Sequence, residues 1–371
     1  MTDKPLVSPL HARHEALGAT IGQEAGWDVP LSYGNVIEEV RALRGRAGVF
    51  DISHHGRIRI RGQGALELLE RVCCGNVARQ EDDTCLQAVL CNQAGGILDC
   101  LWLARAEDFW LLTTSPEGRG KVLEHLRQQA AGLEVKIDDQ TERTAMLEVC
   151  GRQAASLLDA MLPNIRPSQY PSGAVMVGSM LVARYVAMRV GGCNEWSLQV
   201  VLHSMLAGQA WQYVTKRAGN GGIPPAGLAA RDVLRIESGL PRYGCELNET
   251  IDPFLAGLGG AVDFGHDFIG KAVLEGLRAR PPARRPAGLA LLPKGQPQQA
   301  AIPRQGAAVH APDGEEVGTV TSAAYSPTLG QAIALAYVSP QAAAEGAELA
   351  VDGPGQPIPA TVVALPFCRP A

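Results

Sequence analysis

A single carboxylate stands inside an apolar stretch that follows a glycine-rich turn. Residues 92–101 read Asn-Gln-Ala-Gly-Gly-Ile-Leu-Asp-Cys-Leu, with Asp99 between Leu98 and Leu101. Apolar flanks predict two buried strands joined by a tight turn. An ionised Asp in apolar surroundings is costly unless it has a partner or faces a cavity, where it suits acid–base work or cation stabilisation. Asp99 is therefore the candidate catalytic residue; the alternatives are an Asp that caps the turn or meets a buried arginine.

Arginines on a largely apolar helix face form the second informative feature. In Gly227–Gly239 the side chains of Arg231 and Arg235 share one face through i, i+4 spacing. An arginine on such a face needs an anionic partner or a solvent channel. The partner is either internal, such as Asp232 or Glu237, or a carboxylate of a ligand.

Other kinds of site and partner are disfavoured by what the sequence lacks. There is no glycine spacing of a dinucleotide or phosphate loop and no Gly-x-Ser-x-Gly elbow. The net charge is −5 without a basic stripe, which disfavours nucleic acid as a partner. No apolar run is long enough for a signal or a membrane span. The nine cysteines form no C-x-x-C pair and the eight histidines are scattered, so we expect reduced thiols, no metal site and a cytoplasmic location.

The chain of 371 residues predicts two or three domains. Its first fifty residues suggest a helix-rich lead-in with a helix capped by Asn35, followed by a half-exposed strand that begins at Arg57. The order strand, helix, strands, helix then occurs twice before residue 220, which predicts two related α+β modules. A helix over 224–239 should open on a Pro pair, and the short, turn-bounded strands of 287–367 predict a small β-barrel or sandwich. The other expected strands are 86–104 (two), 109–114, 144–149, 175–190 (two) and 196–202, and the other expected helices are 65–73, 118–131, 151–161 and 204–218.

Taken together, the order and spacing of several segments resemble the glycine cleavage T protein family, aminomethyltransferases that use tetrahydrofolate. The resemblance covers nearly the whole length. The matching segments are Gly26-Trp27 with Pro30 and Tyr33-Gly34, 48–54, 92–99, 227–239, 243–253, 267–271, 320–322 and 326–336.

The resemblance implies an α+β fold, a three-domain cloverleaf with folate in a central hole. Residues 1–145 would form the N-terminal folate-binding module, 146–280 a second α+β module that completes the folate-binding region, and 287–371 a C-terminal β-barrel. Asp99 matches the family's essential carboxylate, which can orient the folate amine, help to move a proton and stabilise developing positive charge. Arg231 matches an arginine that contacts the folate.

Departures from the family cluster where the pterin is expected. Where the family has Gly-Tyr-Thr-Gly-Glu, residues 191–195 read Gly-Gly-Cys-Asn-Glu, so Glu195 is kept and Gly192 replaces an aromatic ring. Losing a stacked ring costs about 0.5–1.5 kcal/mol, and Trp196 is the neighbour that we expect to replace it. Gln199 replaces a second Glu that binds the amino-pyrimidine edge, and an amide offers one acceptor and one donor group there.

The expected cofactor-binding set is completed by Tyr243, which lies in a family motif near the site. Three further departures are Cys100 for an Asp, His55 for a Met-like residue and Gly260 for an aromatic. These changes near the pocket, in an otherwise intact scaffold, are typical of a relative with a retuned substrate or a weakened folate site.

The sequence therefore predicts a tetrahydrofolate-dependent one-carbon transferase, aminomethyltransferase-like. Its partners would be tetrahydrofolate and a one-carbon donor, either a lipoyl protein or a small molecule. One alternative is a folate-dependent demethylase of a small methylated substrate. Another is a non-catalytic folate-binding or assembly relative, although Tyr243-Gly-Cys245 lacks the lysine of that subgroup's motif.

Overall fold

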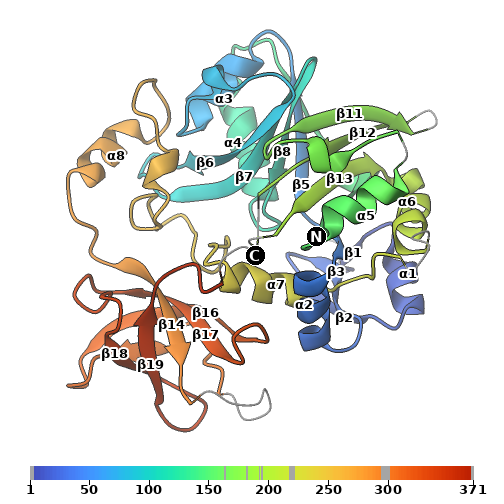
Figure 1. Cartoon of the computed structure of the whole chain (residues 1–371). Helices are drawn as coiled ribbons and strands as arrows, with labels where there is room; N and C mark the ends of the chain where they lie inside the picture. The colour runs from blue at the N-terminus through green and yellow to red at the C-terminus, as the bar shows by residue number, and fades with distance from the viewer. Residues whose placement is uncertain are drawn as a thin grey trace.

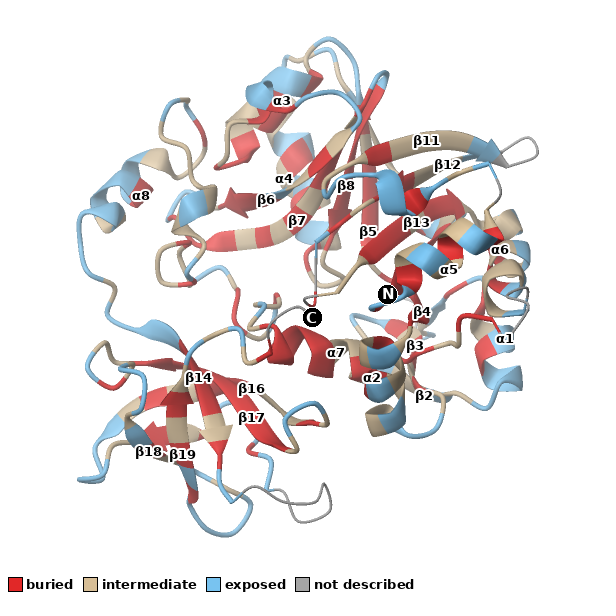
Figure 2. Cartoon of the chain, viewed as in Figure 1, coloured by how far each residue is buried: buried red, intermediate tan, exposed pale blue. Residues whose placement is uncertain are grey.

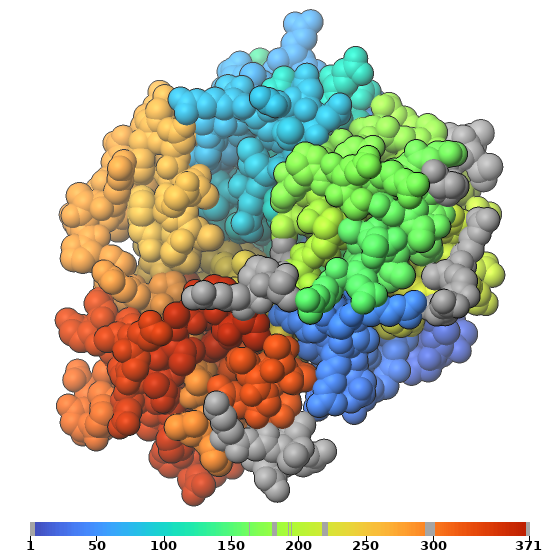
Figure 3. Space-filling model, in the orientation of Figure 1, coloured from blue at the N-terminus to red at the C-terminus, as the bar shows by residue number. Residues whose placement is uncertain are grey.

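In a computed structural model, the chain forms two α+β modules and a closed β-barrel (Figure 1). The structure describes residues 4–162, 164–180, 183–191, 193, 195–216, 222–293 and 301–368. Figure 3 shows the lobes packed closely around the centre of this face of the molecule. Within the described residues, no helix is both long enough and apolar enough to cross a membrane.

The first module is a five-stranded sheet of order β6-β7-β8-β5-β9, in which all neighbours are antiparallel. Its hairpin β6–β7 closes on the glycine-rich turn, where Gly95 has a φ of 82° and Asn92 Oδ1 accepts from the backbone N–H of Ala94 and Gly96. Gly96 must lack a side chain, because a Cβ there would lie 1.8 Å from Glu249 O. The elements are β5 (Gly56–Arg61), α3 (Ala65–Val72), β6 (Thr84–Cys91), β7 (Ile97–Ala106), β8 (Phe109–Thr114), α4 (Arg119–Gln129) and β9 (Lys136–Asp139).

The second module repeats this plan, which confirms two related α+β units. Its sheet has the order β11-β12-β13-β10-β4, again with a strand and helix before a three-stranded meander and a second helix. Strand β4 (Gly48–Asp51) precedes the first module in sequence but pairs with β10 in the second. The domain boundaries at 145 and 146 stay a prediction. The other elements are β10 (Thr144–Cys150), α5 (Ala154–Met161), β11 (Val175–Met180), β12 (Ala183–Met188), β13 (Ser197–His203) and α6 (Ser204–Lys216).

The N-terminal segment is richer in strands than the expected helical lead-in, which was wrong in this respect. A turn at Ala25 and Gly26, with φ of 47° and 79°, joins two antiparallel strands. Positive φ at both positions matches the right-handed twist of a hairpin. The expected helix after Asn35 is confirmed, since the Asn35 side chain accepts from Ile37 N. The elements are β1 (Leu6–Val7), α1 (His11–Ala16), β2 (Thr20–Glu24), β3 (Trp27–Ser32) and α2 (Val36–Gly45).

Helix α7 (Leu228–Glu237) lies between the modules and the barrel, and it is buried along most of its length (Figures 1 and 2). It does not open on the Pro pair as expected. Instead, Pro224 O accepts from Val49 N and Ala226 N donates to Val49 O, so this segment extends the edge of the second sheet. Gly227 then precedes the helix at its N-cap.

The C-terminal region forms a closed six-stranded barrel of order β14-β17-β16-β15-β18-β19, which settles the choice between barrel and sandwich. Its interior is filled by small and branched apolar side chains such as Leu289, Val320 and Val351. Arg235 links α7 to the barrel, because it donates a hydrogen bond to Ser322 Oγ (2.6 Å). The remaining elements are α8 (Lys271–Arg278), β14 (Arg285–Leu291), β15 (Ala308–His310), β16 (Glu316–Ser326), β17 (Gln331–Val338), β18 (Glu348–Val351) and β19 (Ile358–Val363).

Candidate active site

A cavity of about 770 Å³ is lined by residues from both α+β modules and from α7. The described residues that line it run from Glu24 to Leu258, so none of them belongs to the barrel. Candidates that are far apart in sequence meet here. The lining includes Glu195, Trp196, Gln199, Arg231 and Tyr243.

Asp99 lies behind the wall of this cavity rather than on its surface. Side chains alternate along β7, so Cys100 and Trp102 face the cavity, whereas Asp99 is fully buried on the other face of the sheet. Asp99 Oδ1 accepts from Cys100 N (2.9 Å) and Oδ2 from Ser115 N (2.9 Å). Burial raises the pKa of Asp99 to about 6, although the hydrogen bonds from Ser115 favour the ionised form. The carboxylate is thus held rigidly and titrates near neutrality.

The turn after β8 is the part of the site that the sequence did not reveal. Ser115 and Pro116 line the cavity, and Ser115 Oγ accepts from Gly118 N (3.0 Å). A Cβ at Gly118 would lie 2.5 Å from Asp99 Oδ2, so a side chain there would collide with the carboxylate. A signal was present, since Ser-Pro-Glu-Gly is a turn sequence directly before a helix.

Arg231 is paired inside the protein, but not with the partners named from its spacing. Its Nε donates to Glu148 Oε2 (2.9 Å) across 83 residues, and Glu148 also accepts from Ser197 Oγ (2.6 Å). Burial alone would lower the pKa of Arg231, but the Glu148 carboxylate raises it above its ordinary value. Of the internal partners named from spacing, Asp232 is confirmed for the other arginine of this face, since it accepts from Arg235 Nε (2.8 Å), whereas Glu237 accepts from Arg44 and was wrong. Arg231 stays charged and lines the cavity.

Gln199 offers the cavity an unused hydrogen-bond acceptor. Its side chain is 4% exposed, and its Oε1 has no hydrogen-bond partner among the described residues. A buried polar atom without a partner is costly, so a ligand donor such as the amino group of a pterin fits this position. Trp196 also lines the cavity. The Arg189 guanidinium lies over the Trp196 ring, 4.5 Å from its centroid. Gly192 lies outside the described residues.

Glu195 forms an ion pair with Arg44 of α2. Arg44 Nη1 donates to Glu195 Oε1 (2.9 Å) and to Cys193 O (3.0 Å), while Nη2 donates to Glu237 Oε2 (2.6 Å). Glu237 Oε1 in turn accepts from Ser326 Oγ of the barrel (2.6 Å). The barrel therefore supports the cavity wall without lining it.

Tyr243 closes another side of the cavity. It is 6% exposed, and its hydroxyl accepts from Lys121 Nζ (3.2 Å), which also pairs with Glu249 (2.7 Å). Burial raises the pKa of Tyr243, so the phenol keeps its proton at neutral pH. Tyr243 can donate a hydrogen bond to a ligand.

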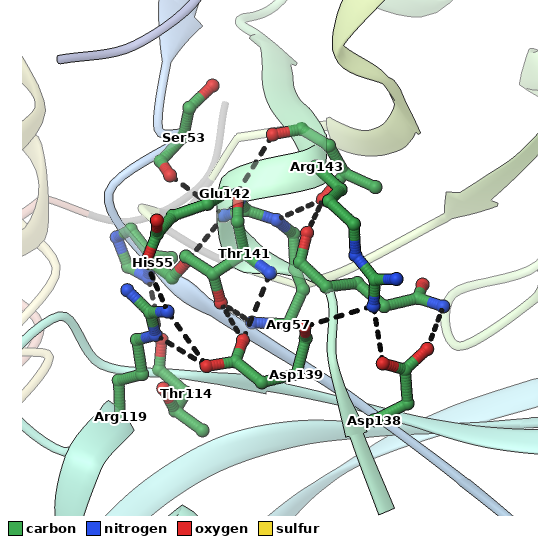
Figure 4. A network of polar contacts seen from close by, with 12 residues as sticks. Ser53, His55, Arg57, Thr114, Arg119, Asp138, Asp139, Thr141, Glu142 and Arg143 are labelled. Carbon is green, nitrogen blue, oxygen red and sulfur yellow. Dashed lines mark hydrogen bonds and ion pairs between the residues drawn. The ribbon is translucent and has the colours of Figure 1, made fainter.

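The loop that carries His55 is fixed by a buried arginine (Figure 4). Arg57 was expected on a half-exposed strand, but it is fully buried and donates to Ser53 O (2.9 Å), to His55 O and to Thr141 O. Backbone carbonyls satisfy its donors in place of water. His55 lines the cavity and contacts Thr114 O through Nδ1 (3.1 Å), while burial and the neighbouring His54 lower its pKa well below the usual value. His55 is therefore neutral at physiological pH.

Comparison with known proteins explains why these residues lie together. The GCVT N-terminal domain matches residues 10–266, and the glycine cleavage T-protein C-terminal barrel domain matches residues 284–368. The chain belongs to the glycine cleavage T-protein family. Among relatives in this family, the aminomethyltransferase of Streptomyces coelicolor is 39% identical over 369 residues, covering 97% of this chain and 96% of the relative. That of Geobacillus thermodenitrificans is 35% identical, covering 98% and 97%.

A solved structure of a T-protein agrees with this assignment. The glycine cleavage system aminomethyltransferase T from Bartonella henselae superposes with a TM-score of 0.88 at 28% identity, covering 98% of both chains. The T-protein fold therefore extends over the whole chain, including the barrel. Membership of the family makes this chain a folate-dependent one-carbon transferase.

Proposed function

We propose that this chain transfers an aminomethyl-derived carbon to tetrahydrofolate held in the cavity, with a lipoyl-bound aminomethyl group as the donor. The observation that carries the proposal is the meeting of five candidate folate-binding residues in one cavity, with Asp99 directly behind its wall. The family's relatives are named aminomethyltransferases, which favours this donor over a methylated small molecule.

Four of the lining residues and Asp99 have distinct tasks in this proposal. Gln199 accepts from the amino-pyrimidine edge, Trp196 offers a flat ring, and Arg231 and Tyr243 donate to polar groups of the ligand. Tetrahydrofolate supplies the nitrogens that take up the carbon. Asp99, ionised above its pKa of about 6, stabilises positive charge that develops near the cavity wall. Because Asp99 itself is fully buried, this interaction is screened by water less than it would be at the surface.

Product analysis decides between donors. Purified protein is incubated with tetrahydrofolate and either an aminomethylated lipoyl protein or a methylated small molecule, and the folate product is identified by mass spectrometry. Methylene-tetrahydrofolate from the lipoyl protein supports the proposal. Methyl-tetrahydrofolate from the small molecule alone indicates demethylation, and no product with any donor would leave a binding or assembly role.

Turnover should rise with pH through the titration of Asp99. Below about pH 6 the carboxyl is protonated and cannot stabilise a cation, so log kcat should rise with unit slope and level off above about pH 7. The measurement is kcat at saturating tetrahydrofolate between about pH 5 and about pH 8. A flat profile in the wild type would contradict a role for the ionised carboxylate.

Tetrahydrofolate should stabilise the folded protein, and Gln199 should contribute to that effect. At a ligand concentration about 100 times Kd, stabilisation is about 2.7 kcal/mol. Gln199→Leu should reduce the ligand-induced rise in Tm, because the amide that faces the pterin is lost. Gln331→Leu is the matched control, since Gln331 is also buried with an unpaired Oε1 among the described residues but lies in the barrel. Equal loss of the shift in both variants would speak against Gln199.

A further inference from the structure

His55 offers the cavity a ring nitrogen that has no task in the function proposed above. The residue lines the cavity, and its Nδ1 lies 3.1 Å from Thr114 O. A carbonyl oxygen can only accept a hydrogen bond, so Nδ1 carries the proton of the neutral ring and Nε2 keeps its lone pair. Nε2 has no hydrogen-bond partner among the described residues, yet it is not shut off from solvent. It is therefore open to a donor group in the cavity.

One peptide group connects His55 to Asp99. The Thr114 carbonyl accepts from His55 Nδ1, and the N–H of the same peptide group, at Ser115, donates to Asp99 Oδ2 (2.9 Å). Hydrogen bonds in a chain polarise one another, so a negative charge on Asp99 makes the Thr114 oxygen a stronger acceptor. A stronger acceptor at Nδ1 favours the imidazolium form of His55, which makes Nε2 a better base.

The contacts around His55 hold its ring in place. His55 N donates to Ile52 O (3.1 Å), and the buried Arg57 donates to His55 O. The ring meets that of His54 edge to face, with the two centroids 4.9 Å apart. A base that is fixed before the ligand arrives loses little freedom when it acts.

The other groups of the described lining that could take up a proton are engaged or hold one already. His54 contacts Glu24 through Nε2 (3.5 Å), and its Nδ1 is buried, so a ligand in the cavity does not reach it. Burial raises the pKa of the Cys100 thiol to about 12 and also raises that of Tyr243, so both keep their protons. The carboxylates in the lining each pair with an arginine at 2.8 to 2.9 Å: Glu24 with Arg242, Glu148 with Arg231, Glu195 with Arg44 and Asp232 with Arg235. His55 is the base that remains.

We propose that His55 Nε2 takes up the proton that a folate nitrogen loses when the carbon is transferred to it, and passes that proton to the departing sulfur of the donor. The N–H bond of the folate and the C–S bond of the donor break, while a C–N bond and an S–H bond form. The electron pair of the C–S bond leaves with the sulfur, and nothing is oxidised or reduced, so no further reactant is needed. The proposal rests on the proposed function, which supplies the nitrogen and the sulfur. The Met-like residue of the family pattern has no basic nitrogen, so this base is a feature of the present chain.

Two substitutions separate proton transfer from the contacts that hold the ring. His55→Asn keeps a donor for Thr114 O but has no group at the place of Nε2, whereas His55→Gln places an amide acceptor there that cannot take up a proton. The single-turnover rate of folate product formation should fall by about 10²-fold in both variants, while His55→Gln keeps the Kd for tetrahydrofolate. His125→Asn is the matched control and should keep the wild-type rate. His125 is also half-buried with a pKa lowered by burial, but it lies on α4 and lines a different pocket.

Nitrogen NMR gives a measurement that does not depend on turnover. In protein whose histidine nitrogens are isotopically labelled, the His55 signals are those missing from His55→Asn. The ligand-free spectrum should show the Nδ1–H tautomer, and tetrahydrofolate should shift the Nε2 signal because Nε2 then accepts a hydrogen bond. An Nε2–H tautomer, or an Nε2 signal that saturating tetrahydrofolate leaves unchanged, would overturn the proposal.

The kinetic outcomes distinguish this proposal from the proposed function. Wild-type rates in both His55 variants together with an inactive Asp99→Asn would overturn the role of His55 and leave the proposed function standing. A normal rate in His55→Gln with a slow His55→Asn would mean that Nε2 only holds the ligand, which overturns proton transfer. Loss of folate binding in both variants would likewise mean a binding role alone. A wild type that transfers no carbon from any donor overturns both proposals.

Discussion

Asp99→Asn should lower kcat by about 10²- to 10⁴-fold, the range that a positioned acid–base group contributes. Asn is nearly isosteric, but it cannot carry the negative charge that Asp99 acquires above its pKa of about 6. Its amide can accept only one of the two backbone N–H bonds from Cys100 and Ser115. The measurement is single-turnover formation of the folate product, with Tm recorded to show that the fold is retained.

Asp108→Asn is the matched control for this change. Asp108 is exposed in the turn between β7 and β8, and its pairing with Arg184 is a long surface contact of 3.5 Å. Exposed ion pairs contribute about 0–1 kcal/mol to the free energy of unfolding. Turnover and Tm of Asp108→Asn should therefore both stay near the wild-type values. Turnover by Asp99→Asn within about threefold of the wild type, far below the effect of a removed acid–base group, would refute the catalytic assignment.

Gly118→Ala should lower kcat almost as severely as Asp99→Asn, although Gly118 has no side chain that could take part in the reaction. Its φ and ψ of −79° and −22° are allowed for alanine, so the obstacle is not backbone strain. The new Cβ would lie 2.5 Å from Asp99 Oδ2 and must displace the carboxylate or the turn. A misplacement of about 1 Å can cost about 10²-fold in rate. We expect kcat to fall by this order and the pH dependence to shift with the altered environment of Asp99.

Gly120→Ala, two residues further on in α4, should leave kcat unchanged. A Cβ at Gly120 meets nothing within 4 Å, so the site should be undisturbed. Replacing glycine inside a helix stabilises by roughly 0.5–1 kcal/mol, and Tm should rise with kcat unchanged. If the two alanine variants had the same kcat, contact with Asp99 would not be the cause of the Gly118 effect.

Local pattern was sufficient for most elements of the fold. Alternation and helical periodicity act over a few residues, and the structure has the repeated strand, helix, meander and helix at the expected places. Local pattern failed where a distant segment supplied the pairing. Pro224 continues the edge of a sheet because Val49 offers it a backbone partner, and Arg57 is buried because carbonyls from the 141–144 segment receive its donors.

The sequence was enough to find a lone carboxylate after a glycine turn inside an apolar strand, and the family resemblance marks Gln199 as the replacement for a carboxylate. The groups that surround these two residues follow only from the packing of the folded chain. Glu148 meets Arg231, Ser115 meets Asp99, and Arg44 supports Glu195 in the cavity wall, over separations of 16 to 151 residues. The physical reason is that burial makes pairing obligatory, whereas only the packing of whole modules determines which groups come within hydrogen-bonding distance.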